Sequence, residues 1–154
     1  MIWTPHATVA TIVEQNGKYL LVEEVVEGTP VLNQPAGHIE EHESIQAAAI
    51  RETLEETGWH VKLTDLVGIY NYLAPNGVTY YRFSFAAEAV QQVPGAQLDY
   101  GIIGPVWLSL DELQARRSQW RSPLVRRCIE DFAAGKRYPL DLIYEHPIER
   151  SANE

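Results

Sequence analysis

The sequence predicts an α+β fold, in which a mixed β-sheet carries one central helix and further helices follow near the C-terminal end. Two observations predict the sheet. Segments rich in Val, Ile, Thr and Tyr occur in pairs, and an Asn-Gly turn separates the members of each pair. Asn and Gly both tolerate the positive φ that a tight hairpin turn requires. The third observation is a segment with helical spacing, residues 44–58, which lies between the two pairs of strands.

The first pair of strands is expected at residues 6–13 and 19–25, joined by the first Asn-Gly turn. A short strand is expected at residues 31–32. Prolines and glycines then break regular structure, so residues 37–43 are expected to form a loop that delivers backbone groups to the start of the central helix.

The central helix has recognisable ends. Ser44 is a suitable N-cap, because its hydroxyl can accept a hydrogen bond from a free N–H of the first turn. Gly58 stands where a left-handed residue ends a helix. Apolar residues occur on two sides of the helix: Ile45, Ala48 and Ala49 on one, and Ala47, Ile50 and Leu54 on the other. This distribution predicts a helix packed between two layers.

The second pair of strands is expected at residues 62–73 and 78–90, around Pro75-Asn76-Gly77. The segment that follows is rich in Pro and Gly and has little periodicity, so it is expected to be a loop. The C-terminal part then predicts, in order, a loop at 91–104, a strand at 105–108, a short helix after Ser109, a longer helix from Ser122-Pro123 to Gly135, and a frayed tail at 150–154.

Composition limits the organisation and the partners. The chain has 154 residues, which suit a single domain over residues 1–154 and are too few for two. No apolar run approaches the ~18 residues of a membrane span, so the expected location is the cytoplasm, without a membrane partner. A net charge of −9 argues against nucleic acid as a partner. The single cysteine, Cys128, excludes an internal disulfide and is expected to be a small core residue.

Three carboxylates share one side of the central helix. Glu52, Glu55 and Glu56 are spaced i, i+3 and i+4, and like charges at that spacing repel each other. No lysine one turn away compensates for them. A solvated acidic face would explain such a group by itself. The alternative is a bound cation, and oxygen ligands without nitrogen or sulfur suit a hard one such as Mg²⁺ or Mn²⁺.

The carboxylates belong to a longer pattern, G-x5-E-x7-R-E-U-x-E-E-x-G-U, in which U is a bulky apolar residue. Its seven specified positions are Gly37, Glu43, Arg51, Glu52, Glu55, Glu56 and Gly58. This pattern resembles the Nudix box, the signature of Nudix hydrolases. Thr53 and Trp59 depart from it at the two U positions. Both are packing positions in the family, so the departures concern the fine geometry more than the chemistry.

The resemblance implies a fold, a cofactor and a catalytic group. The Nudix fold is an α/β/α sandwich around a mixed sheet, with the box helix packed against it. Nudix hydrolases cleave phosphoanhydrides with a metal-activated water, and the implied cofactor is Mg²⁺, with Mn²⁺ as the alternative. The implied metal ligands are Glu52, Glu55, Glu56 and a backbone carbonyl near Gly37. Arg51 would hold Glu43 or Glu55 by an ion pair. The general base would be Glu52 or Glu55, with Asp99 as the candidate outside the box.

Four further residues are candidates for substrate binding. His38 could donate a hydrogen bond to a phosphate, although a loop histidine can simply be exposed. Arg82 lies in an aromatic strand and could reach a terminal phosphate or face solvent. Tyr72 is placed to stack on a heterocycle. Arg121, like Arg137, could bind a phosphate or be a surface arginine.

The substrate class comes from resemblance alone. Residues 33–38, 121–125 and 137–143 resemble bacterial NudJ-type phosphatases, which release orthophosphate from nucleoside tri- and diphosphates and from the diphosphates of thiamine and its hydroxymethylpyrimidine precursor. The first alternative is an ADP-ribose or nucleotide-sugar pyrophosphatase, because the position of Pro75 after the box resembles that of a marker residue in ADP-ribose hydrolases. The second is a Nudix-fold ligand sensor without turnover. The expected partner is a small phosphorylated molecule, bound by a monomer or a small homo-oligomer.

Overall fold

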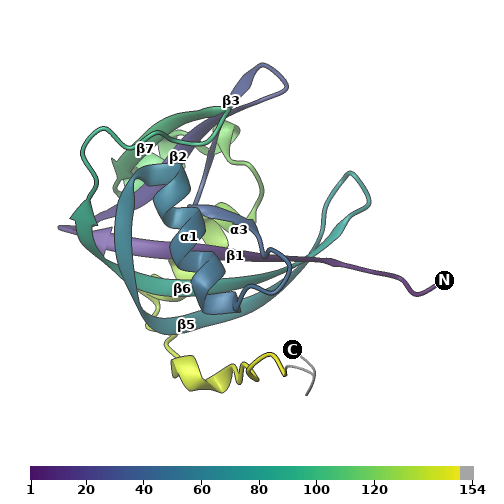
Figure 1. Ribbon diagram of the computed structural model, residues 1–154. Helices are drawn as coiled ribbons and strands as arrows, with labels where there is room; N and C mark the ends of the chain where they lie inside the picture. The colour runs from purple at the N-terminus through teal and green to yellow at the C-terminus, as the bar shows by residue number, and fades with distance from the viewer. Residues whose placement is uncertain (150–154) are drawn as a thin grey trace.

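The computed structural model describes residues 1–149, which form a mixed seven-stranded sheet with helices packed on it (Figure 1). The strands are β1 (His6–Gln15), β2 (Lys18–Val26), β3 (Thr29–Asn33), β4 (Ala36–His38), β5 (Trp59–Leu73), β6 (Thr79–Gln92) and β7 (Ile102–Leu108). The helices are α1 (Ile45–Thr57), α2 (Leu110–Ala115) and α3 (Leu124–Ala133), with short 3₁₀ turns η1 (Arg117–Gln119) and η2 (Leu140–Leu142).

The strands follow the order β3-β2-β1-β6-β5, with β4 paired to β1 and β7 paired to β2. Strands β1 and β6 are parallel, whereas the other pairs are antiparallel. Although β1 and β2 form a hairpin, they pair only beside their turn, at Glu14 opposite Tyr19 and Gln15 opposite Lys18. Beyond those residues β1 pairs with β4, and β2 pairs with β3 and β7. The two strands therefore diverge, and a space opens between them on the side away from the turn.

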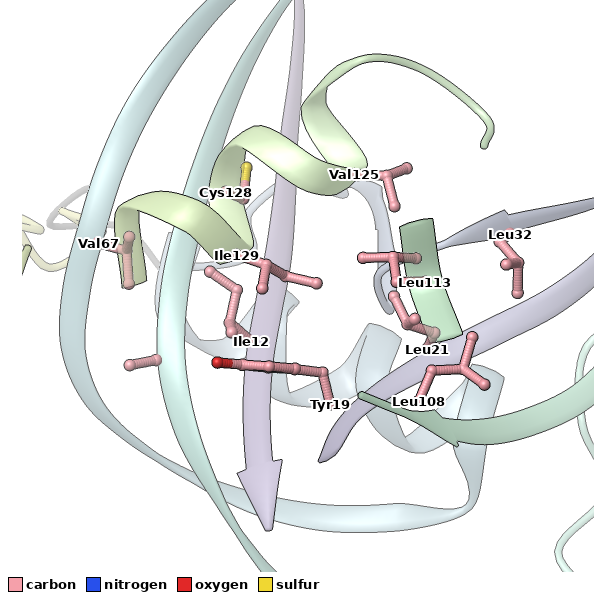
Figure 2. Close-up of a cluster of buried hydrophobic side chains, with 11 residues drawn as sticks. Ile12, Tyr19, Leu21, Leu32, Val67, Leu108, Leu113, Val125, Cys128 and Ile129 are labelled. Atoms are coloured by element: carbon pink, nitrogen blue, oxygen red, sulfur yellow. The ribbon is translucent and has the colours of Figure 1, made fainter. Parts of the chain in front are cut away.

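Helices α1 and α3 lie on opposite faces of β1 and β6 (Figure 1). Because side chains alternate along a strand, Val13 packs in one cluster with Ala48 and Ala49 of α1, whereas the adjacent Ile12 packs with Cys128 of α3 (Figure 2). Each large side chain in these clusters contributes about 1.5–3 kcal/mol of hydrophobic free energy. The arrangement confirms the predicted α+β class and its α/β/α layers, and it confirms Cys128 as a core residue.

The central helix begins and ends at the predicted residues. The Ser44 hydroxyl accepts a hydrogen bond from the Ala47 N–H at 3.1 Å. Gly58 has a φ of 75°, and its N–H donates to the Leu54 carbonyl at 2.9 Å. Only glycine adopts that backbone conformation without strain. These caps fix the length of α1 and so fix which of its side chains face the same way.

Two predicted loops are shorter in the structure. Part of the segment predicted as an irregular loop forms β4, because it pairs with Thr8–Ala10 of β1. Similarly, β7 begins at Ile102, inside the loop predicted at residues 91–104, because it pairs with β2. In both places a partner strand stabilises a segment whose own composition disfavours a strand. The predicted tail at residues 150–154 lies outside the described residues.

None of the helices within residues 1–149 is both long enough and apolar enough to span a membrane.

The buried carboxylate of Asp131 ties α3 to the sheet. It accepts a hydrogen bond from the Tyr70 hydroxyl at 2.7 Å and pairs with Arg127 at 3.1 Å and with Lys136 at 3.3 Å. Burial raises the pKa of Asp131, but these three donors outweigh burial and hold the pKa below its usual value. The Tyr70 hydroxyl is therefore engaged beneath α3.

We expect Asp131→Asn to destabilise the protein by about 1–2 kcal/mol at neutral pH, because it removes a charged acceptor from three donors. A lowered folded-state pKa stabilises the protein above the unfolded pKa, and this contribution is lost as the pH falls through the folded value. The free energies of unfolding of the wild type and the variant, measured in urea, should therefore converge as the pH falls through and below the folded-state pKa of Asp131, which lies under the ordinary value of an aspartate. An unchanged difference at acid pH would contradict this account.

Candidate active site

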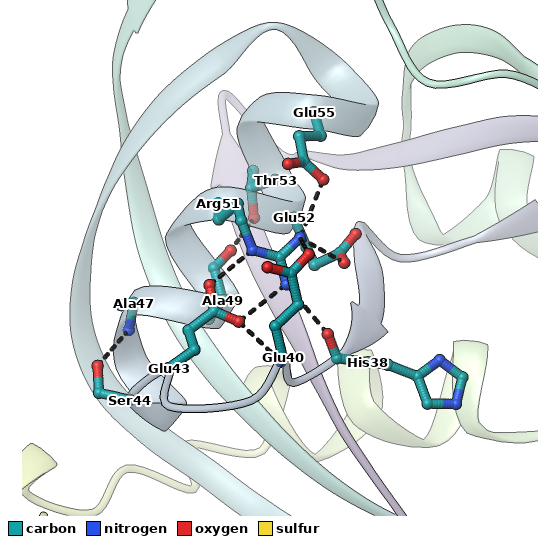
Figure 3. A network of polar contacts seen from close by, with 10 residues as sticks. All are labelled: His38, Glu40, Glu43, Ser44, Ala47, Ala49, Arg51, Glu52, Thr53 and Glu55. Atoms are coloured by element: carbon teal, nitrogen blue, oxygen red, sulfur yellow. Dashed lines mark hydrogen bonds and ion pairs between the residues drawn. The ribbon is translucent and has the colours of Figure 1, made fainter.

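The guanidinium of Arg51 joins the loop after β4 to helix α1 (Figure 3). Its Nε donates to Glu43 at 2.6 Å, and one terminal nitrogen donates to both Glu52 at 2.8 Å and Glu55 at 3.0 Å. The other terminal nitrogen donates to the second Glu43 oxygen at 2.9 Å and to the His38 carbonyl at 3.0 Å. One arginine thus orients three of the box carboxylates and the main chain at the end of β4.

These contacts also determine the charge state of the network. The hydrogen bond from Arg51 is the main reason that the pKa of Glu43 lies below its ordinary value, and the same bond raises the pKa of Arg51. Glu52 behaves differently, because its burial raises its pKa more than Arg51 lowers it. Glu43 is therefore a fixed anion that holds the arginine, whereas Glu52 remains a better proton acceptor.

Three carboxylates converge beside this network. Oxygens of Glu52, Glu55 and Asp99 lie within 4.8 Å of one another, and we refer to these three residues as the carboxylate cluster. The Asp99 N–H donates to the Glu55 carbonyl at 3.2 Å, which brings the loop after β6 against α1. These carboxylate oxygens are hard ligands, and their negative charges repel one another. A nearby hard cation such as Mg²⁺ or Mn²⁺ would offset that repulsion. The residues present therefore suit the metal that the sequence predicts.

Glu56 lies deeper than the cluster. It is 9% exposed, and its carboxylate accepts a hydrogen bond from the Ala36 N–H at 2.7 Å. Burial raises the pKa of Glu56 to about 8, despite this hydrogen bond, and the negative charges of Glu52, Glu24 and Asp99 add to the shift. A nearby cation would offset both effects. Its role as a metal ligand stays a prediction.

Gly37 is required by the close approach of the backbone to Glu52. A β-carbon on Gly37 would lie 2.2 Å from the carboxyl carbon of Glu52. That carboxylate is also held by Arg51 and cannot move away without losing the pairing. The glycine of the pattern thus has a local reason here: only glycine lets β4 lie against the carboxylate.

A pocket of roughly 470 Å³ opens beside the site, where β1 and β2 diverge. We call it the substrate pocket. Its lining comes from β1, β2, the β3–β4 segment, the β5–β6 hairpin and the segment before α3, and comprises Thr8, Glu24, Asn33, Ala36, Gly37, His38, Tyr72, Ala74, Pro75, Asn76, Tyr80, Arg82, Arg121, Ser122 and Leu124. It contains all four residues predicted to bind substrate. Arg137 does not line it: its guanidinium lies 3.7 Å from the centre of the Phe132 ring and donates to the carbonyl of Phe132.

Arg82 is the least exposed cation of the pocket wall, with 7% of its surface accessible. Its guanidinium donates to Gln34 Oε1 at 3.1 Å and to Asn33 Oδ1 at 3.4 Å, both of which are uncharged. Within residues 1–149 no carboxylate lies within 4.0 Å of its nitrogens. The sequence left open whether Arg82 faces solvent, and the structure shows that it does not.

The other predicted binding residues lie around the pocket mouth. The His38 ring lies 2.9 Å from His6 (Nε2 to Nδ1), and burial, together with the charge of His6, lowers the pKa of His38. Tyr72 of β5 stands directly opposite Tyr80 of β6, which gives the pocket an aromatic side. The backbone N–H of Arg121 donates to the Leu32 carbonyl at 2.8 Å and fixes that segment beside β3.

The sequence matches a known protein family: the NUDIX domain family matches residues 4–128. The chain belongs to the Nudix family. It is 39% identical over 142 residues to the phosphatase NudJ of Shigella boydii (strain Sb227) and of Escherichia coli K12, a match that covers 92% of each chain. A NUDIX hydrolase structure from Nitrosomonas europaea is 50% identical, with a TM-score of 0.91, and the match covers 93% of this chain and 98% of that one. The fold alone is shared with a MutT NUDIX hydrolase from Burkholderia pseudomallei, which is 20% identical over 84% of this chain and 98% of that one, with a TM-score of 0.70.

The protein is therefore a Nudix hydrolase, an enzyme that cleaves phosphoanhydride bonds in small phosphorylated substrates. Enzymes of this family generally use Mg²⁺ or Mn²⁺, and the carboxylate cluster is the group in residues 1–149 that could hold such an ion.

The two departures from the Nudix box have structural explanations. Thr53 is fully buried, and its hydroxyl lies 2.8 Å from the Thr11 hydroxyl of β1 and donates to the Ala49 carbonyl. A polar pair therefore replaces an apolar contact between the box helix and the sheet. Trp59 packs edge-to-face on Trp107, with ring centres 6.0 Å apart. Both residues of this Nudix hydrolase thus contact a neighbouring strand.

Three residues of this region were not predicted from the sequence. Glu24 and Tyr80 line the substrate pocket, and Gln34 is 1% exposed beneath it. The side-chain oxygen of Gln34 accepts a hydrogen bond from Arg82, and its side-chain nitrogen donates one to the Val125 carbonyl of α3. A glutamate pair in the otherwise apolar β2 was a signal that could have identified Glu24. Gln34 carried no such signal, because its partners are distant in the sequence.

We expect Gly37→Ala to lower turnover by about a hundredfold, because the new methyl group displaces the Glu52 carboxylate from Arg51. The same change should lower the free energy of unfolding by about 1–3 kcal/mol. In a Glu52→Ala background the clash is absent, so the stability loss should nearly vanish. Equal losses in the two backgrounds, measured by urea unfolding, would show that Gly37 matters for another reason.

Proposed function

We propose that this Nudix hydrolase releases orthophosphate from the terminal phosphoanhydride bond of nucleoside tri- and diphosphates, or of thiamine and hydroxymethylpyrimidine diphosphate. The observation that carries the proposal is the buried guanidinium of Arg82, which faces the substrate pocket with only uncharged partners. A buried cation without an anionic partner destabilises the protein by several kcal/mol. A phosphate of the substrate would supply the missing negative charge.

The carboxylate cluster and the pocket would act together. We propose Glu52, Glu55, Glu56 and the carbonyl of Gly37 as the residues that hold Mg²⁺ or Mn²⁺. The bound ion would neutralise charge on phosphate oxygens and lower the pKa of water. Asp99 is an additional candidate ligand, because it lies in the carboxylate cluster.

Glu52 is the proposed general base, with Glu55 next and Asp99 as the candidate outside the box. The raised pKa of Glu52 supports this choice, since a more basic carboxylate accepts a proton more readily. The water oxygen bonds to the terminal phosphorus, the bond from that phosphorus to the bridging oxygen breaks, and the proton of the water passes to a Glu52 oxygen. Arg51 acts by positioning Glu52 and Glu55.

Residues that line the substrate pocket would bind the phosphates and the ring of the substrate. Arg82, His38 and Arg121, all of which line the pocket, are the proposed phosphate ligands. Tyr72 is proposed to stack against the ring of the substrate, since its partner strand adds Tyr80 to the same wall. The relatives named phosphatase NudJ, similar over nearly the whole chain, support orthophosphate release in preference to other products.

Fewer observations support the two alternatives, the pyrophosphatase and the ligand sensor. Pro75 lines the pocket, as a residue that recognises ADP-ribose would, but the hairpin turn explains Pro75 without a substrate. The Gly77 N–H donates to the Ala74 carbonyl, and the Val78 N–H donates to the Asn76 side chain. A ligand sensor without turnover is disfavoured because every box carboxylate is present. The one-domain organisation, the cytoplasmic location, the small oligomeric state and the absence of nucleic-acid and membrane partners stay predictions.

The decisive experiment identifies the phosphorus product. The protein is incubated with Mg²⁺ and, separately, with ATP, ADP, thiamine diphosphate and ADP-ribose, and the products are resolved by ³¹P NMR. We expect orthophosphate from the first three. AMP and ribose 5-phosphate from ADP-ribose alone would favour the pyrophosphatase, and binding without any product would favour the sensor.

We expect Glu55→Gln and Glu56→Gln each to lower kcat by about two to four orders of magnitude, because each removes a proposed ligand charge. The matched control is Glu41→Gln, since Glu41 is exposed in the loop before α1 and its one ion pair within residues 1–149 is with His42. It should retain wild-type turnover. Circular dichroism verifies that the fold is intact. Rates like those of the wild type in both box variants would refute the metal assignment.

A further inference from the structure

Glu24 is an anion in a pocket that otherwise offers cations and neutral groups to a phosphorylated substrate. It lies on β2 and lines the substrate pocket, together with Arg82 and Arg121. The preceding residue, Glu23, has a different environment, because it forms an ion pair with Arg116 at 3.4 Å outside the pocket lining. Of the two adjacent glutamates, one is therefore paired on the surface and the other faces the substrate.

The carboxylate of Glu24 is half-buried without a close partner. Within residues 1–149 it takes part in no side-chain hydrogen bond and in no ion pair within 4.0 Å. Burial raises its pKa, and the charge of Arg121 reduces the shift without a direct contact. A partly desolvated carboxylate without a donor costs free energy, so a donor brought by a ligand would bind there with a gain.

The position of Glu24 argues against two simpler roles. Its oxygens are not among those that converge in the carboxylate cluster, although its charge reaches Glu56. It also cannot bind the phosphates directly, because a carboxylate repels them. The part of a substrate that Glu24 can bind directly is the part that carries no phosphate, which for the proposed substrates is the heterocyclic ring.

From this placement, which rests on the proposed function, we infer that Glu24 accepts a hydrogen bond from an amino group on the substrate ring and thereby selects amino-substituted heterocycles over their oxo counterparts. An ionised carboxylate only accepts hydrogen bonds. Cytosine and adenine present an amino group at the ring position where uracil and hypoxanthine present a carbonyl oxygen. The carboxylate attracts the first group and repels the second. Glu24 is thus a specificity-determining residue.

The test compares matched nucleotide pairs that differ only at this group: CTP with UTP, and ATP with ITP. For the wild type with Mg²⁺, kcat/KM should favour the amino member of each pair by about tenfold or more. In Glu24→Ala both the attraction and the repulsion are removed, so each ratio should approach one. Glu24→Gln should also lose the preference, because an amide can accept from the amine or donate to the carbonyl.

Controls separate selection from a structural effect. Glu23→Gln, on the same strand but outside the pocket, should keep the wild-type ratios. Inorganic tripolyphosphate, which has no ring, measures any effect of the Glu24 variants on the phosphate end of the pocket, and the ratios of the matched pairs are unaffected by a change that all substrates share. If Glu24 served only to hold Arg121 in place, all substrates would lose activity by the same factor and the ratios would persist, and this result would overturn the inference.

Binding measurements keep this inference distinct from the proposed function. Calorimetric Kd values for the same four nucleotides are obtained without metal, so that no turnover is needed. If the wild type releases no phosphate but binds CTP more tightly than UTP, and Glu24→Ala abolishes that preference, the proposed function fails and the role of Glu24 stands. If phosphate is released without any preference for amino rings, the role of Glu24 fails and the hydrolase proposal stands.

Discussion

The ion-pair network of Arg51 is the interaction on which the site depends. Four carboxylates of one loop and one helix turn would repel one another if they were brought together alone. A single guanidinium removes most of that cost for Glu43, Glu52 and Glu55, and its bond to the His38 carbonyl also fixes β4. The backbone of Gly37 can then lie against Glu52. The carboxylate cluster still gathers negative charge that suits a cation, so the network organises the site without neutralising it.

The sheet supplies the second requirement, a space next to these carboxylates. A hairpin that stayed paired along its whole length would place β2 directly against β1. Here β4 takes the position beside β1, and β2 turns instead towards β3 and β7. The substrate pocket occupies the resulting divergence, and its far wall comes from the β5–β6 hairpin. The same topology that defines the fold therefore brings the aromatic and the cationic sides of the pocket next to the carboxylates.

The sequence predicted best what neighbouring residues determine. The ends of α1 follow from Ser44 and Gly58, and the contacts of Arg51 follow from the fixed spacing of the box. Strand β4 was not predicted, because it exists only through its pairing with β1. Arg82 was recognised as a candidate, but its lack of a carboxylate partner depends on residues 48 and 49 positions away. Features of this kind arise from topology, which local patterns do not encode.

The buried amide of Gln34 extends the consequences of the fold beyond the box. By joining Arg82 to the Val125 carbonyl, it makes the orientation of a pocket-facing cation depend on α3. A designer who grafted only the loop and box helix onto another scaffold would thus transfer the oxygen ligands but leave behind the support that orients Arg82. In this enzyme, the segment that could be transferred to another scaffold contains fewer residues than the whole site needs.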